Sequence, residues 1–174
     1  MKEKADFKRF SRDLPSGLFL ITFGRFISHV AYRLVFPFLP TISRGLGVTT
    51  GTLGTALAIR DLVEMSSPLL GKVKYKRGTN QAMVVGALGL GMAAALEGDS
   101  SGLILFVFAL VLTAISKNSF DIGSSAWAGA SVPYAHRSRA IGMIETTWAL
   151  SFVIGMPIAS VLIRAGTVSY THLR

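Results

Sequence analysis

Residues 103–131 read LILFVFALVLTAISKNSFDIGSSAWAGAS, an apolar run interrupted by a short polar centre. A helix that crosses the hydrocarbon core of a bilayer needs about 20 mostly apolar residues, and this run exceeds that length without a proline. Lys117 and Asp121 stand four residues apart, so they share one helix face. The stretch therefore predicts a membrane-spanning helix whose charges face protein or water rather than lipid.

Four other segments resemble this run in length and hydropathy, and short connectors rich in glycine, proline and charge separate them. The five predicted spans are residues 14–39, 48–70, 79–96, 103–131 and 140–164. Composition agrees, because 51% of the 174 residues are hydrophobic and only 16% are charged, whereas a soluble domain carries about 25% charged residues. We therefore expect an all-α membrane protein that forms one bundle.

The basic residues that give the net charge of +9 are concentrated in alternate connectors between the predicted spans. Eleven of the eighteen lysines and arginines lie in residues 1–13, 72–77 and 137–139, which fall on one side of the membrane if five spans alternate. Basic residues concentrate in cytoplasmic loops, so residues 1–13 are predicted to be a cytoplasmic segment of a protein in the inner or plasma membrane. Nucleic-acid binding would need these residues on one folded face, and no nucleic-acid partner is expected.

Ionisable side chains inside the spans are the candidate functional residues. Such a group near the bilayer centre costs at least about 2.5–3.5 kcal/mol, so each needs a partner or a water-filled cavity. The carboxylates could accept a coupling proton while the cations hold anionic groups or counter-charges; alternatively, Arg60 with Glu64 and Lys117 with Asp121 could be structural pairs. The candidates for substrate binding or proton coupling are Arg25, Asp61, Glu64, Lys117, Asp121 and Glu145.

Arg25, His29 and Arg33 recur at four-residue spacing in the first predicted span. They lie on one helix face, which therefore cannot face lipid. We interpret His29 as a neutral hydrogen-bonding residue rather than a proton relay, and Trp127 and Trp148 as anchors at the membrane interface.

Small residues at four-residue spacing predict close helix packing in two spans. These are Ala87, Gly91 and Ala95 in the third span, and Ser151, Gly155 and Ala159 in the fifth. No metal or other cofactor is predicted, since the spans contain neither a His/Asp metal-ligand spacing nor a Gly-x-Ser-x-Gly nucleophile. We therefore do not expect an enzyme.

The connector at residues 68–80, PLLGKVKYKRGTN, resembles the signature loop between the second and third spans of the major facilitator superfamily. The pattern of that loop is G-x-L-A-D-R-x-G-R-R, and Gly71, Lys76 and Gly78 match its first glycine, first basic residue and second glycine. Tyr75 stands in place of the aspartate. The resemblance implies that Gly71, Lys76 and Gly78 serve gating.

Two further stretches are similar to the same family. Residues 24–40 resemble its arginine-bearing first helix with a V-x-P-x-L-P end, and residues 117–157 resemble the fourth and fifth spans of bacterial drug-efflux members. The resemblance implies a twelve-helix secondary transporter of two six-helix halves that alternates access by rocking. Its partners would be the lipid bilayer, a small organic solute moved by efflux and a coupling proton.

Only five spans of that plan are present, at residues 14–164, and we expect such a chain to lack the sixth span and the second half and not to transport alone. A non-transporting membrane assembly or scaffold subunit is the alternative. Residues 165–174 form a tail, within which residues 168–174, VSYTHLR, resemble a translated adapter from a gene library; a short outside tail is the other interpretation.

Overall fold

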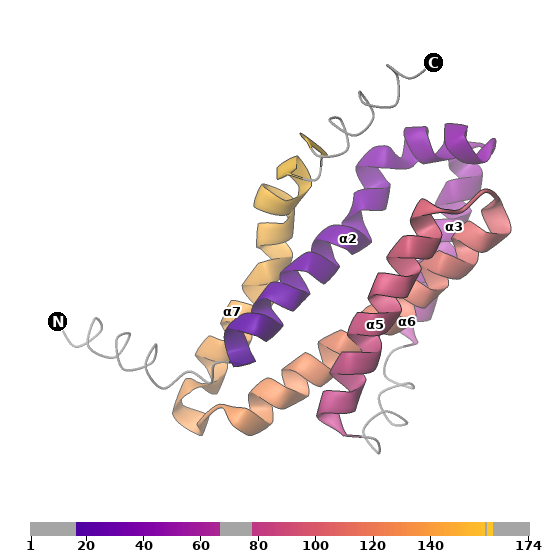
Figure 1. The fold of residues 1–174 in the computed structure, drawn as a ribbon. Coiled ribbons are helices and arrows are strands. Elements are labelled where there is room, and N and C mark those ends of the chain that lie inside the picture. The colour runs from indigo at the N-terminus through magenta and orange to yellow at the C-terminus, as the bar shows by residue number, and fades with distance from the viewer. Residues whose placement is uncertain (1–16, 67–77, 159, 162–174) are drawn as a thin grey trace.

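The computed structural model describes residues 17–66, 78–158 and 160–161, and every regular element within these residues is a helix. Figure 1 shows α2 and α7 side by side, with α3, α5 and α6 together on the other side of α2. The predicted all-α fold is confirmed. The elements are α2 (Gly17–Leu46), α3 (Thr50–Met65), α5 (Thr79–Gly98), α6 (Leu103–Ser131), η2 (Tyr134–His136), α7 (Arg137–Leu150) and η3 (Ser151–Gly155).

Four helical segments of the described chain are long and apolar enough to cross a membrane. These are Gly17–Leu46, Thr79–Gly98, Leu103–Ser131 and Tyr134–Ile158. Within the described residues the count is therefore four rather than the predicted five, because α3, the described helix of the predicted second span at residues 48–70, has only 16 residues. A helix of that length is roughly 24 Å long, short of a hydrocarbon core about 30 Å thick. Residues 67–77 lie outside the described residues.

The first predicted span was wrong at its carboxyl end, residue 39, because α2 continues through Pro37 and Pro40 to Leu46. A proline removes a backbone hydrogen bond, but a membrane helix can continue past it by bending. Figure 1 shows α2 bending near its carboxyl end. The helix stops instead at Gly47, whose φ of 66° is a left-handed conformation that glycine adopts readily.

The fifth predicted span, residues 140–164, starts too late. Residues 134–136 form η2 and α7 begins at residue 137, so much of the predicted connector is helical. The segment ends in a π-helical turn, η3, followed by three α-helical residues to Ile158. The predicted segments at residues 1–13 and 165–174, and residues 162–164, lie outside the described residues.

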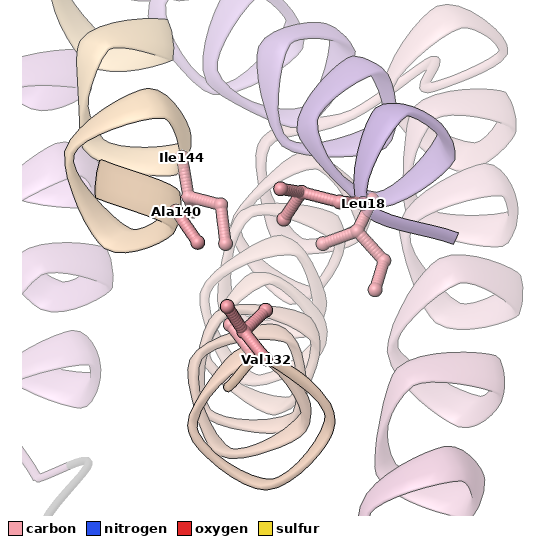
Figure 2. Close-up of a cluster of buried hydrophobic side chains, with 6 residues drawn as sticks. Leu18, Val132, Ala140 and Ile144 are labelled. Atoms are coloured by element: carbon pink, nitrogen blue, oxygen red, sulfur yellow. The ribbon is translucent and has the colours of Figure 1, made fainter. Parts of the chain in front are cut away.

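Two apolar clusters lie toward opposite ends of the helices. Figure 2 shows Leu18, Val132, Ala140 and Ile144 pointing toward one another, where the start of α2 meets the end of α6 and the start of α7. The second cluster joins the carboxyl half of α2 with α3 and the start of α6, and includes Val35, Leu53, Leu57, Phe106 and Leu110. The buried charges of α2 and α6 lie in sequence between the two clusters, so the apolar ends hold the helices that carry them.

α5 packs against α6 through a glycine that the sequence analysis did not select. A Cβ built on Gly86 would lie 2.6 Å from the backbone nitrogen of Phe120, so only glycine allows this approach. The predicted stripe of Ala87, Gly91 and Ala95 is exposed within the described residues and does not form this contact with α6. α5 is apolar nearly all round, so its sequence does not reveal the packed face. In the fifth segment Ser151 and Gly155 are buried as predicted, and Ala159 lies outside the described residues.

Candidate functional site

Lys117 holds two carboxylates at the buried centre of α6. Its Nζ lies 2.8 Å from Oδ2 of Asp121, one turn along the same helix, and 3.0 Å from Oε1 of Glu64 on α3. The first contact confirms the predicted pair at i, i+4. The second joins α3 to α6 and was not predicted, because sequence spacing carries no information about contacts between helices.

Arg25 of α2 links Asp121 to α7. Its Nε lies 3.3 Å from Oδ1 of Asp121, and its Nη1 lies 3.2 Å from Oε1 of Glu145 and donates to the hydroxyl of Ser125. The Nε to Oδ1 contact is an ion pair without hydrogen-bond alignment, since neither atom has a hydrogen-bond partner within the described chain. Asp121 therefore lies between two cations, Arg25 and Lys117.

Tyr32 of α2 joins the remaining charges. Its hydroxyl lies 2.9 Å from Oδ1 of Asp61 and also within hydrogen-bonding reach of Oε2 of Glu64, so its single proton can serve either carboxylate. Arg60 bonds Asp61 at 2.9–3.0 Å. The predicted Arg60–Glu64 pair is therefore wrong. Arg60 instead lies 3.8 Å from the centre of the Tyr32 ring and donates to the backbone oxygen of Tyr32, which turns it away from Glu64.

All six predicted candidate residues thus belong to one set of contacts that spans α2, α3, α6 and α7. We call this set the charge network. Tyr32 was not predicted as a member because it carries no charge, although it lies seven residues after Arg25 and so shares its helix face. The members of the charge network are Arg25, Tyr32, Arg60, Asp61, Glu64, Lys117, Asp121 and Glu145.

The predicted gating residues are described only in part. Gly71 and Lys76 lie outside the described residues. Gly78 immediately precedes α5 with a φ of 90°, a conformation that side-chain-bearing residues rarely adopt. The gating role of all three residues stays a prediction.

Glu97 lies in the last turn of α5 rather than in the predicted connector. The hydroxyl of Thr113 on α6 donates to its Oε1 at 2.7 Å. Thr113 is four residues before Lys117 and lies on the same face of α6. Polar contacts of α6 therefore extend from Asp121 toward the amino-terminal end of the helix.

The sequence of the whole chain was also compared with known proteins. A family model described as Major Facilitator Superfamily matches residues 21–172. The chain belongs to the major facilitator superfamily. The predicted family is confirmed, and with the apolar helices it makes the chain part of a multi-pass membrane protein.

One relative in this superfamily is the uncharacterized MFS-type transporter YwfA of Bacillus subtilis (strain 168). It is 21% identical over 141 residues, which cover 80% of this chain and 34% of YwfA. The chain thus spans about a third of the length of this curated superfamily member. No solved structure matches the chain.

Proposed function

We propose that this chain is part of a secondary transporter that moves a small organic solute out of the cell in exchange for protons. In this proposal the charge network is the coupling site. The observation that carries it is the position of Asp121, a carboxylate between the cations Arg25 and Lys117 in a helix long enough to cross a membrane. Ionisable groups at such positions mark ion and substrate pathways in membrane proteins.

A proton on Asp121 would change which helices the network ties together. The ionised carboxylate attracts Arg25 of α2 and Lys117 of α6 at once. When it is neutralised, Arg25 still has Glu145 and Lys117 still has Glu64. Neither cation is left without a carboxylate, so protonation weakens the contact between α2 and α6 without stranding a buried charge.

Water beside the network offers a route for a proton to reach Asp121, because the Arg25 guanidinium donates hydrogen bonds but cannot accept a proton. The Glu145 side chain is 55% exposed and that of Asp121 is 17% exposed, with Arg25 between them. A carboxylate as exposed as Glu145 in a membrane-spanning segment requires water or protein beside it rather than lipid. Glu145 on one side, and Asp61 with Tyr32 and Glu64 on the other, are therefore the proposed points of proton entry and exit.

Several features of the whole transporter belong to the same proposal. The protein would lie in the inner or plasma membrane of a bacterium with its amino terminus in the cytoplasm, and Gly71, Lys76 and Gly78 would serve gating. Further spans, including the second half, would complete the path, since YwfA is about three times as long as the segment matched here. The activity would be transport rather than catalysis.

A non-transporting scaffold subunit is the competing function, and the mutual pairing within the charge network favours it. Two observations favour transport over a purely structural role. The Glu145 carboxylate of the network is more than half exposed, so it is open to water or to a further part of the protein. Next to the network, the buried Nε2 of His29 has no hydrogen-bond partner among the described residues, whereas buried polar atoms are normally paired.

The test is proton movement in vesicles that contain the natural gene product carrying this sequence, with a trapped pH-sensitive dye. Imposing a gradient of candidate organic solutes should move protons in the opposite direction. The variant Asp121→Asn should abolish this movement while still inserting into the membrane, and Asp99→Asn, at an exposed connector position, should behave like the unaltered protein. If the solute gradient does not change the internal pH, or if Asp121→Asn moves protons as fast as the unaltered protein, proton-coupled transport is rejected and the scaffold function is favoured.

A further inference from the structure

Arg33 stands apart from the other buried cations. Its guanidinium carbon lies 4.4 Å from the ring centre of Trp148 on α7 and 3.8 Å from that of Phe152 in η3. Its Nη1 donates to the backbone oxygen of Trp148 at 3.3 Å. The residue is only 8% exposed, so this cation is largely removed from solvent and is held by aromatic faces and one carbonyl oxygen.

No carboxylate of the described residues forms an ion pair with Arg33, whereas Arg25, Arg60 and Lys117 each have at least one. A guanidinium has five N–H donors, and the bond to Trp148 uses one. A buried charge without a counter-charge is costly. Arg33 therefore has both the charge and the donors to bind an anion that enters from outside the described chain.

A second unsatisfied polar group lies one helical turn from Arg33 on the same face of α2. His29 is buried, and its Nε2 has no hydrogen-bond partner among the described residues. Buried polar atoms are normally paired by protein or water. Two neighbouring groups with unused hydrogen-bonding capacity indicate a place built to receive a polar ligand.

The two aromatic rings supply an open apolar surface beside these groups. Trp148 is 53% exposed and Phe152 is 49% exposed, and the rings meet edge to face with centres 5.5 Å apart. About half of the surface of each residue is thus uncovered, which leaves room for a further ring to stack at centre distances of about 4.5–7 Å. The ligand that fits both features has an anionic group and an aromatic ring.

The position of Arg33 favours a small solute over a lipid headgroup. Arg33 is near the middle of α2, and it packs against Trp148 and Phe152 rather than at a helix end. Phospholipid phosphates lie at the membrane surface. We therefore assign the anion to a molecule that enters the protein, and the experiment below uses a soluble aromatic carboxylate.

We propose that Arg33, Trp148 and Phe152 form a binding site for small aromatic carboxylates, which we call the anion site. The guanidinium binds the carboxylate, the two rings stack on the aromatic part, and His29 lies within the same face to bond a polar substituent. The assignment rests on the proposed transport function, of which it names the substrate class. Binding itself requires no proton movement, so the two proposals can fail separately.

These 174 residues contain two tryptophans, and Trp127→Phe leaves Trp148, inside the anion site, as the only one among them. The experiment titrates this variant in detergent micelles with benzoate while following tryptophan fluorescence. A saturable change is expected, and Trp148→Phe with Trp127 retained should not show it. Benzamide, which keeps the ring without the charge, should bind at least about tenfold more weakly, because a charge-assisted contact is lost.

Arg33→Gln should weaken benzoate binding by about tenfold or more, and Arg33→Lys should restore part of it. Arg44→Gln, an exposed arginine on the same helix, is the matched control and should not change affinity. Circular dichroism melting of each variant separates lost binding from lost folding. Equal affinities for benzoate and benzamide, stronger binding of benzylammonium, no saturation, or an unaffected Arg33→Gln would overturn the anion site.

The outcomes also separate this proposal from the proposed function. Benzoate binding without proton movement in vesicles would keep the anion site and reject proton-coupled transport. Proton movement driven by other solutes, with no benzoate binding, would keep the transporter and reject the substrate class.

Discussion

Two sets of buried polar groups on α2 differ in how they are satisfied. In the first set, which we call the paired side, Tyr32 and Arg25 contact carboxylates that other cations also hold, so each charge there has a counter-charge. In the second set, Arg33 has aromatic rings and a carbonyl oxygen, and His29 has an unpaired nitrogen. Paired charges resist removal, whereas unpaired donors are free to bind. The paired side is therefore expected to govern stability and coupling, and the second set to govern recognition.

The largest effect is expected from breaking the paired side at Lys117. Lys117→Leu leaves Glu64 and Asp121 without their shared cation, so it should lower the free energy of unfolding by about 3–5 kcal/mol. Denaturant unfolding in mixed micelles measures this. The double variant Lys117→Leu with Asp121→Leu removes the adjacent carboxylate and should regain part of the loss, and Arg44→Leu at an exposed position should change little. A loss in Lys117→Leu no larger than in Arg44→Leu would contradict a paired network.

The hydroxyl of Tyr32 provides a smaller test of the same side. Tyr32→Phe keeps the ring beside Arg60 but removes the proton that bonds Asp61 or Glu64, so the free energy of unfolding should fall by about 1.5–3 kcal/mol. Tyr134→Phe, at a position that is 87% exposed, is the matched control and should have no measurable effect. Equal stability of the two variants would mean that water replaces the Tyr32 hydroxyl.

The contact between α2 and η3 is tested at Gly155. A Cβ there would meet a methyl carbon of Val30 and lie 3.5 Å from the ring of Phe26, so Gly155→Ala should lower the free energy of unfolding by about 1–3 kcal/mol. Gly142→Ala in α7 meets nothing within 4 Å and should instead raise it by about 0.5–1 kcal/mol, because alanine favours a helix interior. We thus predict effects of opposite sign, and a gain in stability in both variants would show that η3 does not pack closely against α2.

The smallest effect on stability is expected at Arg33, which sharpens the contrast with Lys117. Arg33→Leu removes cation–π contacts and one hydrogen bond but strands no carboxylate, so the free energy of unfolding should change by no more than about 1–2 kcal/mol. The same denaturant unfolding compares it with Lys117→Leu directly. A loss as large as that of Lys117→Leu would show that Arg33 is a structural cation and not a ligand-binding one.

The difficult parts of the fold were those in which local signals compete. The boundaries of α6 follow from its apolar run and its glycine and serine ends, and they match the prediction. Pro40 is a strong local stop signal, yet α2 bends and continues to Leu46. α5 is apolar on every side, so its sequence did not distinguish Gly86 from Gly91 as the residue in contact with α6.

In the candidate site, too, some residues could be predicted from the sequence and others could not. The six charged candidates could be selected because an ionisable residue in an apolar span needs a partner. Tyr32 and the cross-helix pair of Lys117 with Glu64 could not, because a neutral residue gives no such signal and the partner stands 53 residues away in the chain. The aromatic contacts of Arg33 were hidden for the same reason, since the sequence predicts only an interfacial anchor at Trp148.

The amino-acid sequence by itself determined that this chain forms apolar helices in a membrane, which of its connectors are basic, which residues inside the helices carry charge and to which superfamily it belongs. Hydropathy, helical periodicity and loop charge are properties of short segments, so they can be read without a fold. Only the tertiary structure decided which charges neutralise one another and that Arg33 has no carboxylate partner among the described residues. Those outcomes depend on how each helix is rotated and packed against its neighbours, and spacing along one helix does not specify that rotation.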